Sequence, residues 1–196
     1  MLAENILASV FADPAYPASV ALLYGKVRIE PGRRIQGEPT DFQRLVGSNI
    51  PHQAIFYDRR LLLHYGGYDL HYPVLADYDL NLRIFERRDA DTFFIDKVIA
   101  VFSSRGVSNR TLDAAFFTDK LEVLRKQHHI NARDQRLAHY YFYSGMAYWL
   151  KKNYVRGIRN MLHPMFFSHR RLHYALHAAA FLLAQLGIGR KFRMAT

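Results

Sequence analysis

The chain has 196 residues, of which 50% are hydrophobic and 22% charged, a composition that indicates a globular protein and excludes a disordered or collagen-like one. It contains no cysteine, which excludes disulfide frameworks, cysteine-ligated zinc, iron–sulfur clusters and thiolate catalysis. The first residues hold neither a basic segment nor an apolar stretch long enough for a signal peptide or membrane anchor, so we expect a cytoplasmic protein.

The net charge of +10 is concentrated in the second half of the chain. Residues 1–100 hold 11 Lys or Arg against 13 Asp or Glu, whereas residues 101–196 hold 16 against 4. No acidic residue follows Asp134, so this last third repels itself unless an anionic partner is near. Anionic lipid, nucleic acid and a diphosphate all fit this charge. A solvated basic face without a partner is the alternative interpretation.

The first half is predicted to mix helices and strands. Apolar spacing of three to four residues predicts helices, and β-branched or aromatic runs predict strands. The predicted elements are a helix at 4–12, a strand at 20–30, a polar loop at 31–49, a strand at 52–57, a helix at 58–65 that Asp58 caps and Gly66 and Gly67 end, a helix at 76–88, and a strand at 92–104 followed by a turn at Arg105 and Gly106.

From Thr111 onward the pattern predicts only helices, near 112–129, 134–152, 154–162 and 168–187, with breaks at Gly145 or Asn153 and at Pro164. The glycines at 145 and 157 lie in a helix pair that loosely resembles a tetratricopeptide hairpin, although one copy cannot form a solenoid. We therefore predict two regions, an α/β region over 1–110 and a basic, all-α region over 111–196.

Four short motifs follow one another in the α/β region. They are IPHQAIFYDRRLL from residue 50, GGYDLHY from 66, ADYDLNLRIF from 76 and FIDKVIAVFSSRGVS from 94. In this order they resemble the second half of the catalytic domain of family 2 glycosyltransferases, inverting GT-A enzymes that use nucleotide sugars. The resemblance covers residues 1–108. It implies a partial GT-A-like mixed sheet with flanking helices, and a role in cell-surface polysaccharide or glycolipid synthesis.

On this resemblance Asp77 is the catalytic base, although the Glu that commonly precedes it in the family is Ala76 here. Inverting transfer needs a carboxylate at this place because the acceptor hydroxyl must lose its proton as it attacks the anomeric carbon. Hydrolytic carboxylates flank the glycosidic bond, whereas Asp77 and Asp79 share one helix, so we favour transfer over hydrolysis. A first-turn acid that stabilises the helix is the alternative role for Asp77.

The resemblance also implies substrate-binding roles for residues near the acceptor and the diphosphate, namely His52, Gln53, Gly67, Tyr68, Asp69, Asp79 and Arg83. Each has a purely structural alternative. Arg83 and Asp79 are spaced for a helical ion pair, a histidine such as His52 is commonly an interior residue, and the glycines fit an ordinary helix end.

Two parts that a GT-A enzyme carries upstream of the resembling segment are not found in this sequence. One is the N-terminal region that binds the donor nucleotide, and the other is the Asp-X-Asp element that binds Mg²⁺ or Mn²⁺. We therefore expect a shortened domain that has little turnover alone and associates with the missing N-terminal half or with another copy. The substrates implied for the complete enzyme are a nucleotide-sugar donor and a saccharide or lipid-linked acceptor.

The segment 171–193 is apolar for about sixteen residues and has arginines at both ends, which is short for a membrane span. It fits an interfacial helix on an anionic membrane, at the inner face of the membrane, or else the packed face of a helix pair. A noncatalytic basic module that docks to a membrane or protein is the alternative function. Nucleic-acid binding is disfavoured because the sequence holds no recognition-helix or RNP-type signature.

Overall fold

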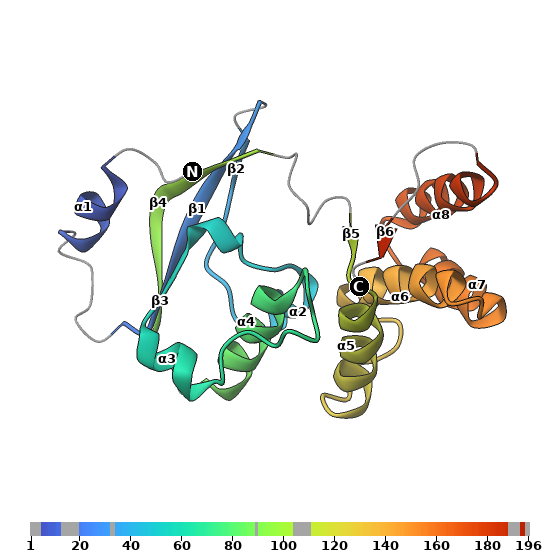
Figure 1. Ribbon diagram of the computed structural model, residues 1–196, viewed down its shortest axis with the longest axis horizontal. Helices are drawn as coiled ribbons and strands as arrows, with labels where there is room; N and C mark the ends of the chain where they lie inside the picture. The colour runs from blue at the N-terminus through green and yellow to red at the C-terminus, as the bar shows by residue number, and fades with distance from the viewer. Residues whose placement is uncertain are drawn as a thin grey trace. The chain divides into compact units, whose positions relative to one another are not determined.

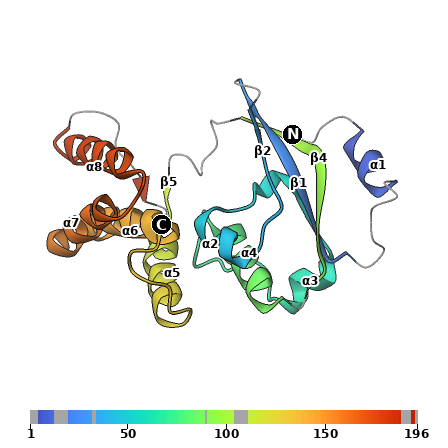
Figure 2. The same cartoon turned by 180° about the vertical axis from the view of Figure 1, so that it is seen from behind.

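The computed structural model describes residues 5–12, 20–31, 34–88, 90–103, 111–187 and 193–194, and its chain forms two compact units (Figures 1 and 2). The first unit comprises Met1–Asp69 and Ala76–Asn109, and the second comprises Leu70–Leu75 and Arg110–Thr196. The first unit is α/β with a mixed sheet, and the second is mainly helical. This confirms the predicted fold class.

The sheet of the first unit is built around β1 (Leu22–Glu30). On one side β1 pairs in parallel with β4 (Thr92–Ser103). On the other side it pairs in antiparallel fashion, first with β3 (Ile55–Tyr57) and then with β2 (Arg34–Gln36). Gly25 lies where the register of β1 and β4 shifts, and a Cβ there would come within 2.8 Å of the Ile99 side chain. A larger residue would push these two strands apart.

Helices cover both faces of this sheet. The short α1 (Ile6–Phe11) buries Ile6 and Val10 in one core with Leu23 and Ile99. The longer α4 (Ala76–Arg87) lies on the other side of the sheet, where its Phe85 packs edge-on against Tyr24 at 6.1 Å. Since successive strand residues face opposite ways, Leu23 and Tyr24 serve these two different layers.

Two predictions for the first unit are wrong in detail. The segment 31–49, expected to be a loop, contains β2 and also α2 (Phe42–Gly47), whose first turn is capped by the Asp41 side chain at 2.8 Å from the Arg44 amide. The segment expected to be a strand from residue 52 begins as a 3-10 turn, η1 (His52–Ala54), and only then becomes β3. The next helix, α3 (Arg59–His64), is capped by Asp58 as predicted.

The second unit is a series of packed helices, α5 (Ala114–Lys126), α6 (Ala138–Leu150), α7 (Tyr154–Leu162) and α8 (Arg171–Gln185), with 3-10 turns η3 (Gln135–Leu137) and η4 (His163–Phe166) between them. The expectation of helices alone is wrong, because β5 (Thr111–Leu112) pairs in parallel with β6 (Arg193–Met194). The turn predicted at Arg105 and Gly106 lies outside the described residues.

The helices α6 and α7 approach each other closely at two glycines. A Cβ on Gly145 would lie only 2.6 Å from the Met161 amide nitrogen, and one on Gly157 would lie 3.0 Å from the Trp149 amide nitrogen. Gly145 therefore permits a close helix contact and does not break α6. The break falls at Asn153, whose side chain caps α7 by accepting a hydrogen bond from the Arg156 amide at 3.3 Å.

One face of α8 is packed against its own unit. Its buried residues recur at helical spacing and are Tyr174, Ala178, Phe181 and Ala184. The leucines at 172 and 176 on the same helix are exposed. Within the described ranges, none of the helices combines the length and apolarity needed to cross a membrane.

Candidate functional site

Asp77 lies in the first turn of α4, at the end of the helix where backbone amides favour a negative charge. Its Oδ2 accepts a hydrogen bond from the Asn49 side-chain amide at 3.0 Å, and 19% of its side chain is exposed. Burial raises the pKa of Asp77 above its ordinary value of 3.8, although the nearby His52 and hydrogen bonds from the Tyr78 amide and Asn49 act in the opposite direction. The carboxylate is thus both reachable from solvent and more basic than usual.

His52 stands beside this carboxylate. Its Nδ1 is 3.8 Å from the Asp77 Oδ2, and 54% of its side chain is exposed. The alternative interpretation of His52 as an interior residue is therefore wrong. Gln53 follows on the same 3-10 turn and is half-buried.

Asp77 is held by a chain of polar side chains from three segments of the first unit, namely the loop after α2, β3 and α4. The Tyr57 hydroxyl donates to Asn81 Oδ1 at 2.8 Å, and the Asn81 amide donates to Asn49 Oδ1 at 3.0 Å, leaving the Asn49 amide directed at Asp77. Asn81 is completely buried, so its two hydrogen bonds fix its orientation. Burial, reinforced by the negative charges that Tyr68 and Asp77 can carry, raises the pKa of Tyr57 and keeps its hydroxyl a donor.

Three members of this polar chain, Asn49, Tyr57 and Asn81, were not among the residues predicted from the sequence. Asn81 carried a usable signal, because it follows Asp77 by four residues and therefore shares its helix face. Asn49 and Tyr57 come from separate elements that only the tertiary fold brings together.

Tyr68 borders the same site. Its side chain belongs to an exposed loop residue, and its pKa is raised first by partial burial and then by the charge of Asp77. The charge of Asp77 therefore acts on the Tyr68 phenol. Asp69, the next residue, is also exposed.

The remaining predicted residues, Gly67, Asp79 and Arg83, form a separate set of contacts. Arg83 Nε donates to the buried Asp79 at 2.8 Å, which is the helical ion pair considered from the sequence, and its Nη2 donates to the Gly67 carbonyl at 2.8 Å. It also donates to the Tyr65 carbonyl. Gly67 has a φ of 71°, a left-handed conformation that favours glycine. Arg83 therefore ties the loop after α3 to α4, and its contact with a diphosphate stays a prediction.

The divalent cation implied for the complete domain is expected to bind an acidic element upstream of this segment, and that expectation stays a prediction. The polar groups around Asp77 are one carboxylate, one imidazole and one amide, and within the described residues no group of three or more His, Asp or Glu is arranged to hold a metal ion.

The chain is similar to glycosyltransferases of two mycobacteria. The proteins named PGL/p-HBAD biosynthesis glycosyltransferase in Mycobacterium bovis (strain BCG / Pasteur 1173P2) and in Mycobacterium tuberculosis (strain ATCC 25177 / H37Ra) are each 39% identical to it over 97 residues. That match covers 48% of this chain and 38% of each relative, so the chain spans well under half of these relatives. No family model and no solved structure matches the chain.

Proposed function

We propose that this chain carries the acceptor side of an inverting, nucleotide-sugar-dependent glycosyltransferase that acts in glycolipid synthesis. The observation that carries the proposal is the partly exposed Asp77 carboxylate with a raised pKa, held in place by Asn49 and flanked by His52. The similarity to mycobacterial glycosyltransferases named for PGL/p-HBAD biosynthesis supports the reaction class and the glycolipid acceptor.

In the proposed step Asp77 acts as general base. The acceptor hydroxyl oxygen forms a bond to the anomeric carbon of the donor sugar while the bond from that carbon to the diphosphate oxygen breaks. The hydroxyl proton passes to the Asp77 carboxylate, and the electron pair of the broken bond leaves with the diphosphate. One displacement inverts the anomeric centre.

The surrounding residues have defined roles in this proposal. A raised pKa makes the carboxylate a better proton acceptor, because general-base efficiency increases as the pKa approaches the working pH. Asn49 fixes the direction of the carboxylate, and Tyr57 and Asn81 act through Asn49 as positioning residues. The exposed His52 and Tyr68 are placed to contact the acceptor.

The test is a chimera in which this chain's α/β region, residues 1–110, replaces the corresponding segment of a mycobacterial relative. Transfer of labelled sugar from a nucleotide sugar to that relative's acceptor is measured for the chimera and its Asp77→Asn variant. Loss of the base is expected to lower kcat by about 10²–10⁴-fold.

Asp96→Asn is the matched control, because Asp96 is 75% exposed and pairs with Lys26 away from the candidate site. It is expected to leave kcat unchanged. Retention of turnover by Asp77→Asn, with the control equally active, would show that Asp77 is not the base. Circular dichroism of each variant separates loss of catalysis from loss of fold.

A further inference from the structure

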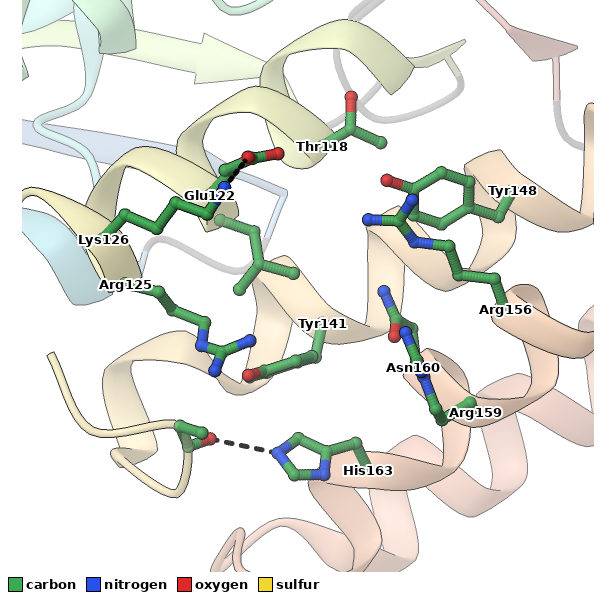
Figure 3. Close-up of a pocket in the computed structure, with 12 residues that line it drawn as sticks. Thr118, Glu122, Arg125, Lys126, Tyr141, Tyr148, Arg156, Arg159, Asn160 and His163 are labelled. Atoms are coloured by element: carbon green, nitrogen blue, oxygen red, sulfur yellow. Dashed lines mark hydrogen bonds and ion pairs between the residues drawn. The ribbon is translucent and has the colours of Figure 1, made fainter.

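The helical unit contains a pocket of about 480 Å³ formed by α5, α6, α7 and the turns beside them (Figure 3). All of its lining residues belong to this one unit. Pockets of roughly 300–1,000 Å³ are the usual size for small ligands. None of its lining residues is among those described around Asp77, and the proposed transfer step uses none of them.

The pocket is strongly cationic. Arg125 and Lys126 extend from α5, and Arg156 and Arg159 extend from α7 on the other side of the opening. The one carboxylate in the lining is Glu122, which forms an ion pair with Lys126. Glu122 also interacts electrostatically with Arg156, so the lining sets four Lys or Arg side chains against one carboxylate.

The three guanidinium groups of the lining have no carboxylate within ion-pair distance elsewhere in the described part of the chain. The ion pairs of the helical unit are made by other cations, such as Lys126 with Glu122 and Arg136 with Asp134. Three like charges held this close repel one another, at a cost that an anionic ligand removes.

Aromatic rings hold two of the guanidinium groups in place. The Arg156 guanidinium carbon lies 4.1 Å from the centre of the Tyr148 ring, and that of Arg125 lies 5.9 Å from the Tyr141 ring. Tyr141 is also within the electrostatic range of Arg159, so its ring lies between the two sides of the pocket. Stacking orders a guanidinium while its N–H groups remain available at the edge, which is the geometry that binds phosphate oxygens in pairs.

Buried contacts stabilise the floor of the pocket. His163 packs against Tyr141 at 4.2 Å and its Nε2 lies 3.1 Å from the Ala132 carbonyl oxygen. Asn160 is buried and donates to Ser144 Oγ at 3.0 Å, which joins α7 to α6 directly under the arginines. The cationic groups therefore project from a rigid support, as ligand recognition requires.

We propose that this pocket binds a ligand with two adjacent phosphate groups. A phosphate monoester carries roughly two negative charges, so one alone would leave part of the three-guanidinium charge uncompensated, whereas a diphosphate matches it. Forked guanidinium donors suit phosphate oxygens, and the tyrosines at the pocket offer faces for an attached ring. The ligand is either a soluble diphosphate or the diphosphate headgroup of a lipid.

The experiment is isothermal titration calorimetry of the 196-residue chain with inorganic pyrophosphate and, for comparison, inorganic phosphate. Pyrophosphate is expected to bind more tightly than phosphate, and its affinity is expected to fall as salt is added. In the variant Arg125→Gln/Arg156→Gln, binding is expected to weaken by at least about tenfold, because two charge-assisted contacts are lost.

The matched control is Arg170→Gln/Arg171→Gln, which removes the same charge from exposed positions outside the pocket. It is expected to bind pyrophosphate as the unmodified chain does. Equal weakening in both double variants would overturn the proposal and indicate a nonspecific basic surface. Circular dichroism confirms that each variant is folded.

A second variant is expected to bind pyrophosphate more tightly than the unmodified chain. Glu122→Gln removes the single carboxylate of the lining and frees Lys126, so pyrophosphate is expected to bind several-fold more tightly. Disruption of the fold would not produce this result. An unchanged or weaker affinity would contradict the proposed pocket.

Vesicle pelleting distinguishes the two sources of the ligand. The chain is mixed with phosphatidylcholine vesicles that contain or lack a polyprenyl diphosphate. Binding to both free pyrophosphate and the diphosphate vesicles, lost in the Arg125→Gln/Arg156→Gln variant, supports the site and allows a lipid headgroup as ligand. Binding to pyrophosphate alone supports a soluble ligand. If the chain binds neither pyrophosphate nor the diphosphate vesicles, the proposal is overturned.

Discussion

The polar chain behind Asp77 can be tested by Asn81→Leu, which keeps the branched shape and heavy-atom number of the side chain and removes both of its hydrogen bonds. The substitution leaves the Tyr57 hydroxyl and the Asn49 side-chain oxygen without their partner, and both lie in a half-buried to buried setting. A buried polar group left unsatisfied costs about 1–3 kcal/mol, so two such groups cost at most about 6 kcal/mol. Because both are only half-buried and the apolar side chain offsets part of the cost, the expected loss in the free energy of unfolding is about 2–4 kcal/mol.

Urea unfolding followed by circular dichroism measures this loss, and a double-mutant cycle with Tyr57→Phe isolates the hydrogen bond at 2.8 Å. Tyr57→Phe removes the hydroxyl that Asn81→Leu leaves without a hydrogen-bond partner. The double variant is therefore expected to lose less free energy of unfolding than the sum of the two single losses. Strictly additive losses, or a loss below about 0.5 kcal/mol for Asn81→Leu, would refute the polar chain as the support of Asp77.

Three other substitutions test further parts of the structure. Arg83→Gln removes the ion pair of Arg83 with the buried Asp79 carboxylate and is expected to cost about 3 kcal/mol in a urea melt, whereas adding Asp79→Asn should recover part of that loss. Gly145→Ala is expected to lower thermal stability, since about 1–3 kcal/mol of overpacking against Met161 outweighs a helix-propensity gain of about 1 kcal/mol; a more stable variant would contradict the close helix contact. Burial lowers the pKa of His139 from 6.5 to about 4, so the unfolded chain takes up a proton that the folded chain does not, and stability should fall as the pH drops from 6.5 towards 4. His139→Phe should flatten that part of the stability curve, and an unchanged pH dependence would argue against this histidine as its source.

The elements that could be predicted from the sequence are those with a strong local pattern. The apolar run of β4, the helical spacing of α4 and the Asp58 cap of α3 depend on residues close together in the chain. The strand β2 has three exposed residues and no amphipathic pattern, so it exists because Val27–Ile29 of β1 offers it a pairing edge. The short pair of β5 and β6 joins residues about eighty positions apart, and no local pattern could indicate it.

The candidate site also contains some contacts that follow from local spacing and others that depend on the tertiary fold. The ion pair of Asp79 with Arg83 follows from helical spacing, and Asp77 was selected through resemblance to a family. The Asn49 contact with Asp77 spans 28 residues and joins the loop after α2 to α4, whose packing is a property of the whole unit. A sequence read by itself could name the carboxylate but could not show what holds it.

Three of the acids at helix starts, Asp58, Asp77 and Asp134, distinguish a capping role from a catalytic one. Their side chains are comparably exposed, at 28%, 19% and 23%. Asp58 and Asp134 each pair with an arginine two residues later, and hydrogen bonds from that arginine lower their pKa values, as expected of acids that only stabilise a helical turn. Asp77 is held by a neutral amide and stands beside a histidine, with no arginine or lysine of the described chain at ion-pair distance, and burial raises its pKa. Such an arrangement makes the charged carboxylate less favourable than it would be in a simple cap, and it is the arrangement that a proton acceptor requires.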